Sequence, residues 1–216
     1  MHQQGSVILK CLYIDAPDPA FLSLAAPYEA GFLDAEELRR YLNEDEYELS
    51  ERFVTRALAM SDECFAIRAG DTLAAYGWYS LGAHRFSDEQ TLRFAPQWVY
   101  MHHGFTHTAH RGRRLHAISM TMALAAYQAR GFRGLVSLVA ADNDASLKSC
   151  HRMGYRPFGT LYTFRLGRLL GLRHAKGRLL NAPFAYCTPG CRPFGFWLER
   201  TTSSAPAASE PEPLKN

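Results

Sequence analysis

The chain has 216 residues, of which 47% are hydrophobic and 12% aromatic, and its formal net charge is +3. This length and apolar content predict one globular domain with a substantial core and exclude a disordered chain. The net charge is too small to predict nucleic-acid binding, so we expect no nucleic-acid partner.

No run of about 18 apolar residues occurs, and the N-terminus lacks a basic region followed by an apolar stretch and a cleavage site. The sequence therefore predicts a cytoplasmic protein without a membrane span. The five cysteines are odd in number and irregular in spacing, which indicates reduced thiols. Cys187 and Cys191 are close enough to share a metal ion, but no second pair completes four ligands, so we expect no metal there.

The first half of the chain predicts a strand, two helices and a hairpin. Residues 7–14 are rich in β-branched side chains and end before two prolines, as a strand would. Asp34 and Glu37 have the spacing of a capping box, and a second amphipathic segment starts at Ser50. Two β-prone runs then meet across Gly70 and Asp71, which predicts a hairpin. We expect the polar segment 82–96 to be a loop.

The second half begins with an apolar run from Trp98, which predicts another strand. After Arg111 a long pattern is apolar on most faces and stops at Gly131, as expected of a buried helix. Residues 135–140 predict a strand buried on both faces, and Asn143 is placed to cap a short helix.

The C-terminal part predicts two further strands, at residues 155–166 and 194–198, separated by an irregular basic segment. From residue 201 onward the chain is small, polar and rich in proline, so we expect residues 201–216 to form a disordered tail.

Residues 98–116 carry the strongest functional signal. There a strand runs into a turn that bears glycine and arginine at the start of the long helix. Free backbone N–H groups, the positive end of the helix dipole and guanidinium charges would then lie together. This arrangement predicts an anion site, most naturally for a phosphate or pyrophosphate, although a solvated basic helix start is the competing interpretation.

The order of elements and two motifs resemble the GCN5-related N-acetyltransferase (GNAT) superfamily. The segment from Arg111 to His116 resembles the family's acetyl-CoA pyrophosphate loop, Arg/Gln-x-x-Gly-x-Gly/Ala. Asn143-x-x-Ser146 followed by Gly154 and Tyr155 resembles the family's Asn-x-x-Ala leading to Gly-Phe. The resemblance implies a single α/β domain over residues 1–200. Its mixed, mostly antiparallel central sheet would have about seven strands, with helices on both faces.

The resemblance also implies acetyl-CoA as the acyl donor and a set of donor-binding residues. Backbone N–H groups of the splayed fourth strand would bind the thioester and pantetheine, the loop would bind the pyrophosphate, and the second motif would contact pantetheine. These residues are Gly104, Phe105, Thr106, Arg111, Gly112, Arg113, Arg114, Leu115, His116, Asn143 and Ser146.

The chain departs from the family pattern at three positions. Arg114 stands where the family has its central glycine, and His116 stands where it has glycine or alanine. Glycine allows the backbone to approach the phosphates closely. Side chains at both positions therefore change the loop geometry expected from the family pattern. Cys150 stands where the family commonly has the tyrosine that protonates the departing thiolate.

His102 and His103 occupy the positions where many relatives have an acidic pair that supplies the base. Neutral imidazole is a competent base near neutral pH. Adjacent strand residues point to opposite faces, so we expect at most one of the two to face the substrate, and we favour His103. The Cys150 thiol is a candidate proton donor, although packing as a small apolar side chain is the competing role.

Five histidines fall between residues 102 and 116, which raises the question of a metal site. Their spacings follow no known ligand pattern and no acidic residue or cysteine lies among them in the sequence, so we expect no metal.

The predicted function is acyl-CoA-dependent transfer, most naturally of acetyl, to a primary amine of a small molecule or peptide by direct attack. A non-catalytic acyl-CoA-binding or regulatory module, and an acyltransferase that takes longer acyl groups from CoA or a carrier protein, are the alternatives. The basic residues between 168 and 178 would favour an acceptor that carries carboxylate or phosphate. The sequence leaves a homodimer open.

Overall fold

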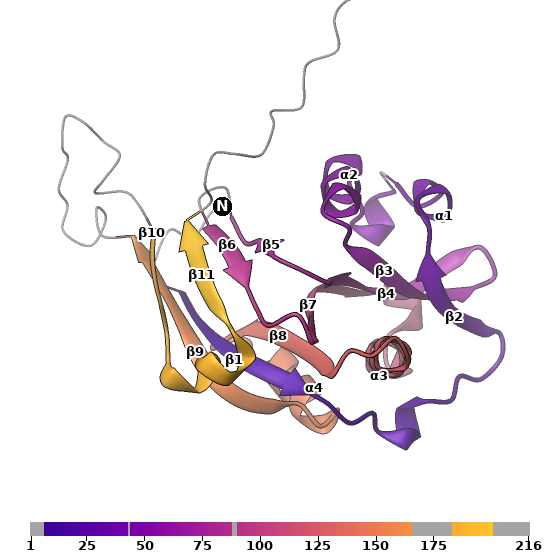
Figure 1. Cartoon of the computed structure of the whole chain (residues 1–216). Coiled ribbons are helices and arrows are strands. Elements are labelled where there is room, and N and C mark those ends of the chain that lie inside the picture. The colour runs from indigo at the N-terminus through magenta and orange to yellow at the C-terminus, as the bar shows by residue number, and fades with distance from the viewer. Residues whose placement is uncertain (1–6, 43, 88–89, 166–182, 201–216) are drawn as a thin grey trace, which may run out of the picture.

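The structure is a computed structural model that describes residues 7–42, 44–87, 90–165 and 183–200 (Figure 1). The four α-helices of this part of the chain are α1 (Ala35–Arg39), α2 (Glu51–Ala59), α3 (Leu115–Ala129) and α4 (Asp144–Arg152). The strands are β1 (Val7–Ile14), β2 (Tyr28–Leu33), β3 (Glu63–Ala69), β4 (Thr72–Ser80), β5 (His84–Arg85), β6 (Gln90–Arg93), β7 (Trp98–Thr106), β8 (Gly134–Ala140), β9 (Arg156–Arg165), β10 (Pro183–Cys187) and β11 (Trp197–Arg200).

Eight strands form the main sheet in the order β10-β9-β1-β8-β7-β4-β3-β2. Every neighbouring pair is antiparallel except β7 and β8, which are parallel. The predicted mixed, mostly antiparallel sheet is therefore confirmed. It has one strand more than the seven or so expected. Neither β2 nor β10 was predicted, since β10 falls in the segment expected to be irregular, and the strand expected near the C-terminus joins a different sheet.

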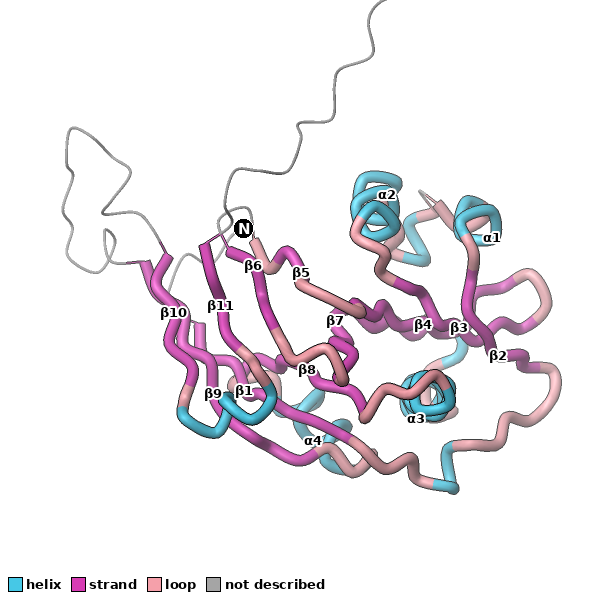
Figure 2. Tube along the Cα trace, viewed as in Figure 1, coloured by secondary structure: helices cyan, strands magenta, loops and turns pink. Residues whose placement is uncertain are grey.

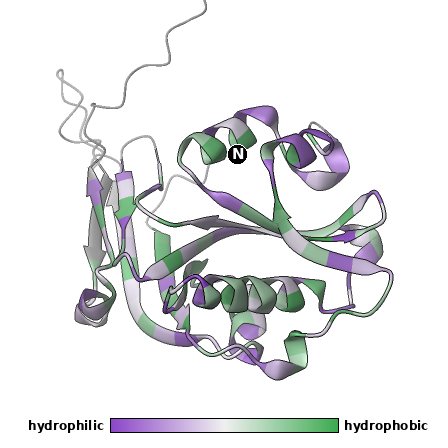
Figure 3. Cartoon of the chain, turned by 45° about the vertical axis from the view of Figure 1, so that its right-hand side comes forward, coloured by the Kyte–Doolittle hydropathy of each residue, from purple (hydrophilic) through white to green (hydrophobic). Residues whose placement is uncertain are grey.

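The helices cover both faces of the main sheet, as predicted. In Figure 1, α1 and α2 lie on one side of β3 and β4, and α3 lies on the other side. Trp78 packs with the α1 and α2 residues, whereas its neighbour Tyr79 packs with Tyr127 and Leu124 of α3. Hydrophobic residues dominate along α3 (Figure 3), which fits its position beneath the sheet.

The predicted helix caps are confirmed. The Asp34 carboxylate accepts hydrogen bonds from the Glu36 and Glu37 amides at 2.8 Å, and the Asp34 amide donates to the Glu37 carboxylate at 3.0 Å. Ser50 caps α2 by accepting from the Phe53 amide at 3.3 Å. These contacts satisfy amide groups that have no acceptor within the helix.

The hairpin of β3 and β4 turns at Gly70, whose φ of +60° lies in the left-handed region. The predicted loop at 82–96 is wrong, since this segment contains β5 and β6. These strands form a second sheet with β11, in the order β11-β6-β5 (Figure 2). Arg93 of β6 pairs with Trp197 of β11 and donates to Glu199 at 2.7 Å, so the partner lies far along the chain.

The last predicted strand is shifted, because residues 189–194 form a 3-10 helix (Pro189–Phe194) and β11 starts only at Trp197. The predicted basic segment at 168–178 and the tail at 201–216 lie outside the described residues. Among the helices that the structure describes, none is long and apolar enough to cross a membrane.

Candidate active site

The two parallel strands at the centre of the sheet separate halfway along. β7 pairs with β8 only from Trp98 to Met101, where the partner residues run from Gly134 to Ser137. Beyond Met101, β7 continues to Thr106 and is held on its other edge by β4, with Gly104 opposite Gly77. Because alternate residues of a strand direct their amide groups to opposite edges, this end of β7 presents backbone groups toward the opening.

A pocket of about 860 Å³ lies at this opening, where the end of β7, the turn before α3 and one face of α4 meet. Eight residues predicted from the sequence line it, together with two that were not predicted. The predicted residues are Gly104, Phe105, Thr106, Arg111, Gly112, His116, Ser146 and Cys150; the others are Ala145 and Ser149.

Ala145 and Ser149 belong to the same face of α4 as Ser146 and Cys150. The four residues have the spacing i, i+1, i+4 and i+5, which places them together on a helix surface. This spacing was available in the sequence. The family motif singled out Ser146 and Cys150 alone, so the neighbouring positions were missed.

The helix α3 starts at Leu115, directly after the loop residue Arg114. No side chain of the described residues caps it, and its first turn contains no acidic residue. The first amide groups of a helix lack intrahelical acceptors and carry the positive end of the dipole. Neither a carboxylate nor a side-chain cap therefore competes with an anion at this position.

The predicted pyrophosphate loop divides into two groups. Arg111, Gly112 and His116 line the pocket, and Arg111 Nε donates to the Thr106 carbonyl at 3.3 Å, which holds the guanidinium close to β7. The remaining loop residues do not line the pocket. Arg113 and Arg114 are exposed, and Leu115 is buried against Ile67, Ala74 and Ala75.

Arg114 adopts the backbone conformation that explains the family's glycine. Its φ of 61° and ψ of 16° lie in the left-handed region, which costs a residue with a Cβ on the order of 1 kcal/mol. Thus the loop keeps a conformation suited to glycine while carrying a cation there.

Asn143 lies beside the pocket and does not line it. Its side-chain oxygen accepts from the Ser146 amide at 3.0 Å and so caps α4, as the sequence predicted. This cap fixes the end of α4 that carries Ser146.

Cys150 is buried at the pocket wall. Burial raises the pKa of its thiol to about 11, so the group is protonated at neutral pH. A thiol of this kind is a weaker acid than an ordinary cysteine, whose pKa is about 8.5.

The expectation that His102 and His103 point to opposite faces is wrong. The register between β4 and β7 shifts, so that Trp78 pairs with His103 and Tyr79 pairs with Met101. His102 is then the extra residue of a β-bulge, which breaks the alternation of side chains. His103 contacts Phe53 of α2, and His102 lies 3.3 Å from Asp62, which follows α2.

His103 has a defined hydrogen-bonding environment one residue before Gly104. Its Nε2 lies 3.4 Å from the Tyr76 hydroxyl, which donates its own proton to the Tyr47 carbonyl at 2.8 Å. His103 Nε2 must therefore be the donor in this pair, which leaves Nδ1 with a free lone pair. Burial lowers the pKa of His103, with Glu48 opposing the shift, so the ring is neutral at neutral pH.

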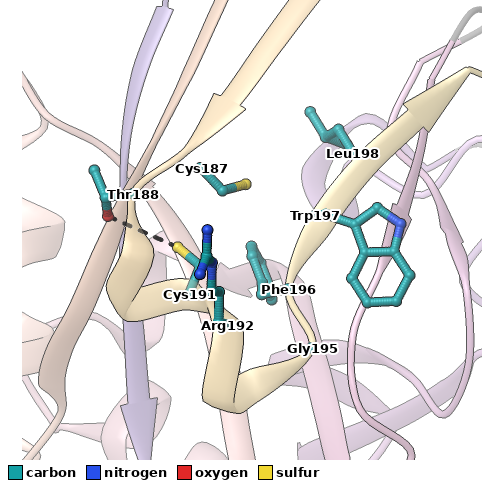
Figure 4. Close-up of a pocket in the computed structure, with 8 residues that line it drawn as sticks. All are labelled: Cys187, Thr188, Cys191, Arg192, Gly195, Phe196, Trp197 and Leu198. Carbon is teal, nitrogen blue, oxygen red and sulfur yellow. Dashed lines mark hydrogen bonds between the residues drawn. The ribbon is translucent and has the colours of Figure 1, made fainter.

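A second hollow, of about 390 Å³, lies between the end of β10, the Pro189–Phe194 helix and β11 (Figure 4). Cys187, Cys191 and Arg192 line it, and none of its lining residues is shared with the larger pocket. Burial raises the pKa of the Cys187 thiol to about 12, so this side chain is protonated near neutral pH.

Three comparisons place the chain among known proteins. A family model described as "Acetyltransferase (GNAT) family" matches residues 27–155. No curated protein sequence matches the chain.

Three solved structures are similar to the chain. A GCN5-related N-acetyltransferase from Sphaerobacter thermophilus has a TM-score of 0.51 and 13% identity, with 74% of this chain and 50% of that chain covered. A GNAT-family protein from Novosphingobium aromaticivorans DSM 12444 has a TM-score of 0.49 and 18% identity (73% and 62% covered). A GCN5-related N-acetyltransferase-like protein from Streptococcus suis 89/1591 has a TM-score of 0.48 and 15% identity, with 73% of this chain and 61% of that chain covered. The chain thus spans less than two thirds of the length of each of these three structures.

Proposed function

Because the chain belongs to the acetyltransferase (GNAT) family, we propose that it is an acyl-CoA-dependent N-acyltransferase. It transfers acetyl from acetyl-CoA to a primary amine of a small molecule or peptide by direct attack. The observation that carries the proposal is the pocket where β7 leaves β8, since this pocket also opens onto the uncapped start of α3.

The diphosphate of the donor binds at the start of α3. The free amides of the first helical turn and the Arg111 guanidinium supply positive charge there. The pantetheine arm then follows the free edge of β7 past Thr106 and Phe105, with Ser146 and Ser149 of α4 on the opposite wall. This path leads the thioester toward Gly104, near the point where the two strands separate.

Backbone N–H groups of β7 stabilise the oxyanion that develops on the thioester carbonyl. Such a donor is preorganised by the sheet, because β4 holds residues 104–106 in register on the other edge. Removing a comparable donor from other enzymes costs on the order of 3 kcal/mol of barrier. Holding amine and thioester together lowers the barrier by about 7 kcal/mol or more.

His103 accepts a proton from the attacking amine through its free Nδ1 lone pair. Phe105 connects this residue to the donor pocket. It is one of the residues that line the pocket, and its ring stacks on Tyr76 with 5.2 Å between ring centroids, while the Tyr76 ring stacks on His103 at 5.8 Å. As the amine nitrogen bonds to the carbonyl carbon, the carbon–sulfur bond breaks and the thiolate leaves with the electron pair.

Solvent protonates the departing thiolate in this proposal. With a pKa of about 11, Cys150 would donate to a thiolate of ordinary pKa, about 8.5, at a cost of roughly 3 kcal/mol. We therefore assign Cys150 to the apolar wall of the pocket.

Carboxylates near His103 and His107 favour an acceptor that carries a positive charge. Glu48 is close enough to influence the pKa of His103, and Glu46 lies 3.3 Å from His107 Nε2. Both glutamates are exposed beside the short helix Asp45–Tyr47. They attract the ammonium form of the acceptor, which releases one proton to solvent before the neutral amine attacks and gives its second proton to His103.

The test is a titration of the full chain with acetyl-CoA by calorimetry, followed by thiol release with a panel of primary amines. The proposal expects binding and amine-dependent thiol release, and the variant His103→Gln should bind the donor normally while losing about 100-fold or more in turnover. The variant His151→Gln, which changes an exposed histidine of α4, serves as the control.

Three other outcomes would contradict parts of the proposal. Binding without thiol release for every amine would favour a non-catalytic acyl-CoA-binding module. Thiol release only from donors with longer acyl chains, or only from an acylated carrier protein, would favour an acyltransferase that takes longer acyl groups. Full turnover by His103→Gln would remove His103 as the base.

A further inference from the structure

Three side chains with metal-binding groups meet away from the donor pocket. Asp62 lies between α2 and β3, His84 is on β5, and His102 is the bulge residue of β7. One ligand atom from each lies within 4.8 Å of the other two. The cluster offers one carboxylate and two imidazoles, a donor set that suits zinc and other divalent transition metals.

Two polar atoms of this cluster lack hydrogen-bond partners among the described residues. The side chains of Asp62 and His102 are only 3% and 7% exposed, and Asp62 Oδ1 and His102 Nε2 are the atoms without partners. His102 Nε2 is 3.3 Å from Asp62 Oδ2, but the contact does not have hydrogen-bond geometry. Leaving a buried polar group unpaired costs about 1–3 kcal/mol, so an ion bound to His102 Nε2 would remove that penalty for the imidazole.

The separations of the ligand atoms fit a tetrahedral ion. Bonds of about 2.0–2.1 Å to zinc place neighbouring ligand atoms about 3.4 Å apart. The Asp62 carboxylate oxygen Oδ2 is 3.3 Å from His102 Nε2 and 3.7 Å from His84 Nδ1. The side chain of His84 is 17% exposed, which gives an ion a route from solvent.

We propose that Asp62, His84 and His102 bind one divalent transition-metal ion, with Zn²⁺ as the ion that fits best. Coordination through His84 Nδ1 replaces its 2.9 Å contact with the Ser80 hydroxyl. A solvent molecule completes the tetrahedron. The ion joins β5 and the segment after α2 to the bulge of β7, and it thereby fixes the strand position from which His103 projects.

The experiment uses the full chain, stripped with EDTA and dialysed, and titrated with Zn²⁺ by calorimetry and with Co²⁺ by visible absorption. We expect one equivalent to bind, with the strong visible bands of a tetrahedral Co²⁺ site. Zn²⁺ should also raise the Tm, because it binds the folded state alone. The variants His84→Asn and Asp62→Asn should each weaken binding by at least about tenfold.

His151→Asn is the matched control, since it removes an exposed histidine and should leave the binding unchanged. His84 lies on a two-residue strand and is partly exposed, so its substitution should disturb the fold little. Asp62→Asn keeps the shape of the side chain. At least one of the two variants should therefore fold, which circular dichroism checks. Wild-type protein that binds neither ion would overturn the proposal. Binding that His84→Asn and Asp62→Asn leave intact would overturn it as well.

Discussion

The imidazole of His116, in the first turn of α3, packs directly against the α-carbon of Gly104 on β7. A Cβ at residue 104 would lie 2.5 Å from His116 Cε1 and 2.9 Å from Met101 Cε. The contact joins the start of α3 to the strand at the opening of the pocket. The histidine at this family glycine position and the glycine on the strand therefore fit each other as a pair.

Gly104→Ala should displace the His116 ring and narrow the pocket. We expect a loss of about 1–3 kcal/mol in the free energy of unfolding from overpacking, and about a tenfold weaker acetyl-CoA affinity. Calorimetry and thermal unfolding measure the two effects. Gly31→Ala is the control, because no atom lies within 4 Å of a Cβ built there. If both variants had the same stability and the same acetyl-CoA affinity, the contact between His116 and Gly104 would not matter for either property.

Arg111→Ala should weaken acetyl-CoA binding by about tenfold to 100-fold, as expected for the loss of a charge-assisted hydrogen bond to phosphate. The same variant should bind acetyl-pantetheine, which lacks the diphosphate, as well as wild type does. Arg113→Ala changes an exposed arginine outside the pocket and should have the smaller effect. An equal loss for both donors would place Arg111 away from the diphosphate.

Arg114→Gly should raise the free energy of unfolding by about 0.5–1 kcal/mol, because glycine adopts the left-handed conformation without strain. Arg114→Ala retains the Cβ and should give no such gain. Chemical denaturation compares the two variants. A stability ranking with alanine above glycine would show that the backbone at this position is not strained.

Cys150→Ala should keep acetyl transfer within about fivefold of wild type, because the thiol is too weak an acid to protonate the leaving group efficiently. Steady-state thiol release at saturating donor measures the effect, and Ser149→Ala on the same wall is the control. A drop of two orders of magnitude or more in the Cys150 variant alone would restore the thiol as the proton donor.

Stability should fall as the pH is lowered from 7 to 5. Burial lowers the pKa values of His102 and His116, so the unfolded chain binds protons below about pH 6.5 that the folded chain does not. Stability is therefore complete above that pH and is lost as the pH falls toward the folded pKa values, by up to about 1.4 kcal/mol per pH unit for each ring. Urea unfolding across this range measures the slope, which should decrease in His116→Asn. A flat profile would mean that these rings titrate normally.

Local signals allowed much of the fold to be predicted. The caps at Asp34, Ser50 and Asn143, the turn at Gly70 and the apolar pattern of α3 each involve residues within a few positions of one another, so a short stretch of sequence contains the whole interaction. The two motifs, together with the strand residues 104–106 implied by the family resemblance, likewise predicted most residues that line the pocket. Spacing along α4 would have added Ala145 and Ser149.

Only the tertiary structure decided the remaining features. β5 and β6 are strands because β11, more than a hundred residues later, completes their sheet. A bulge determines where His102 and His103 point, and it arises from the pairing with β4 and not from the sequence of β7 alone. Asp62, His84 and His102 meet because three separate segments converge beside that bulge. Contacts between distant segments depend on how the whole chain packs, and no local pattern records them.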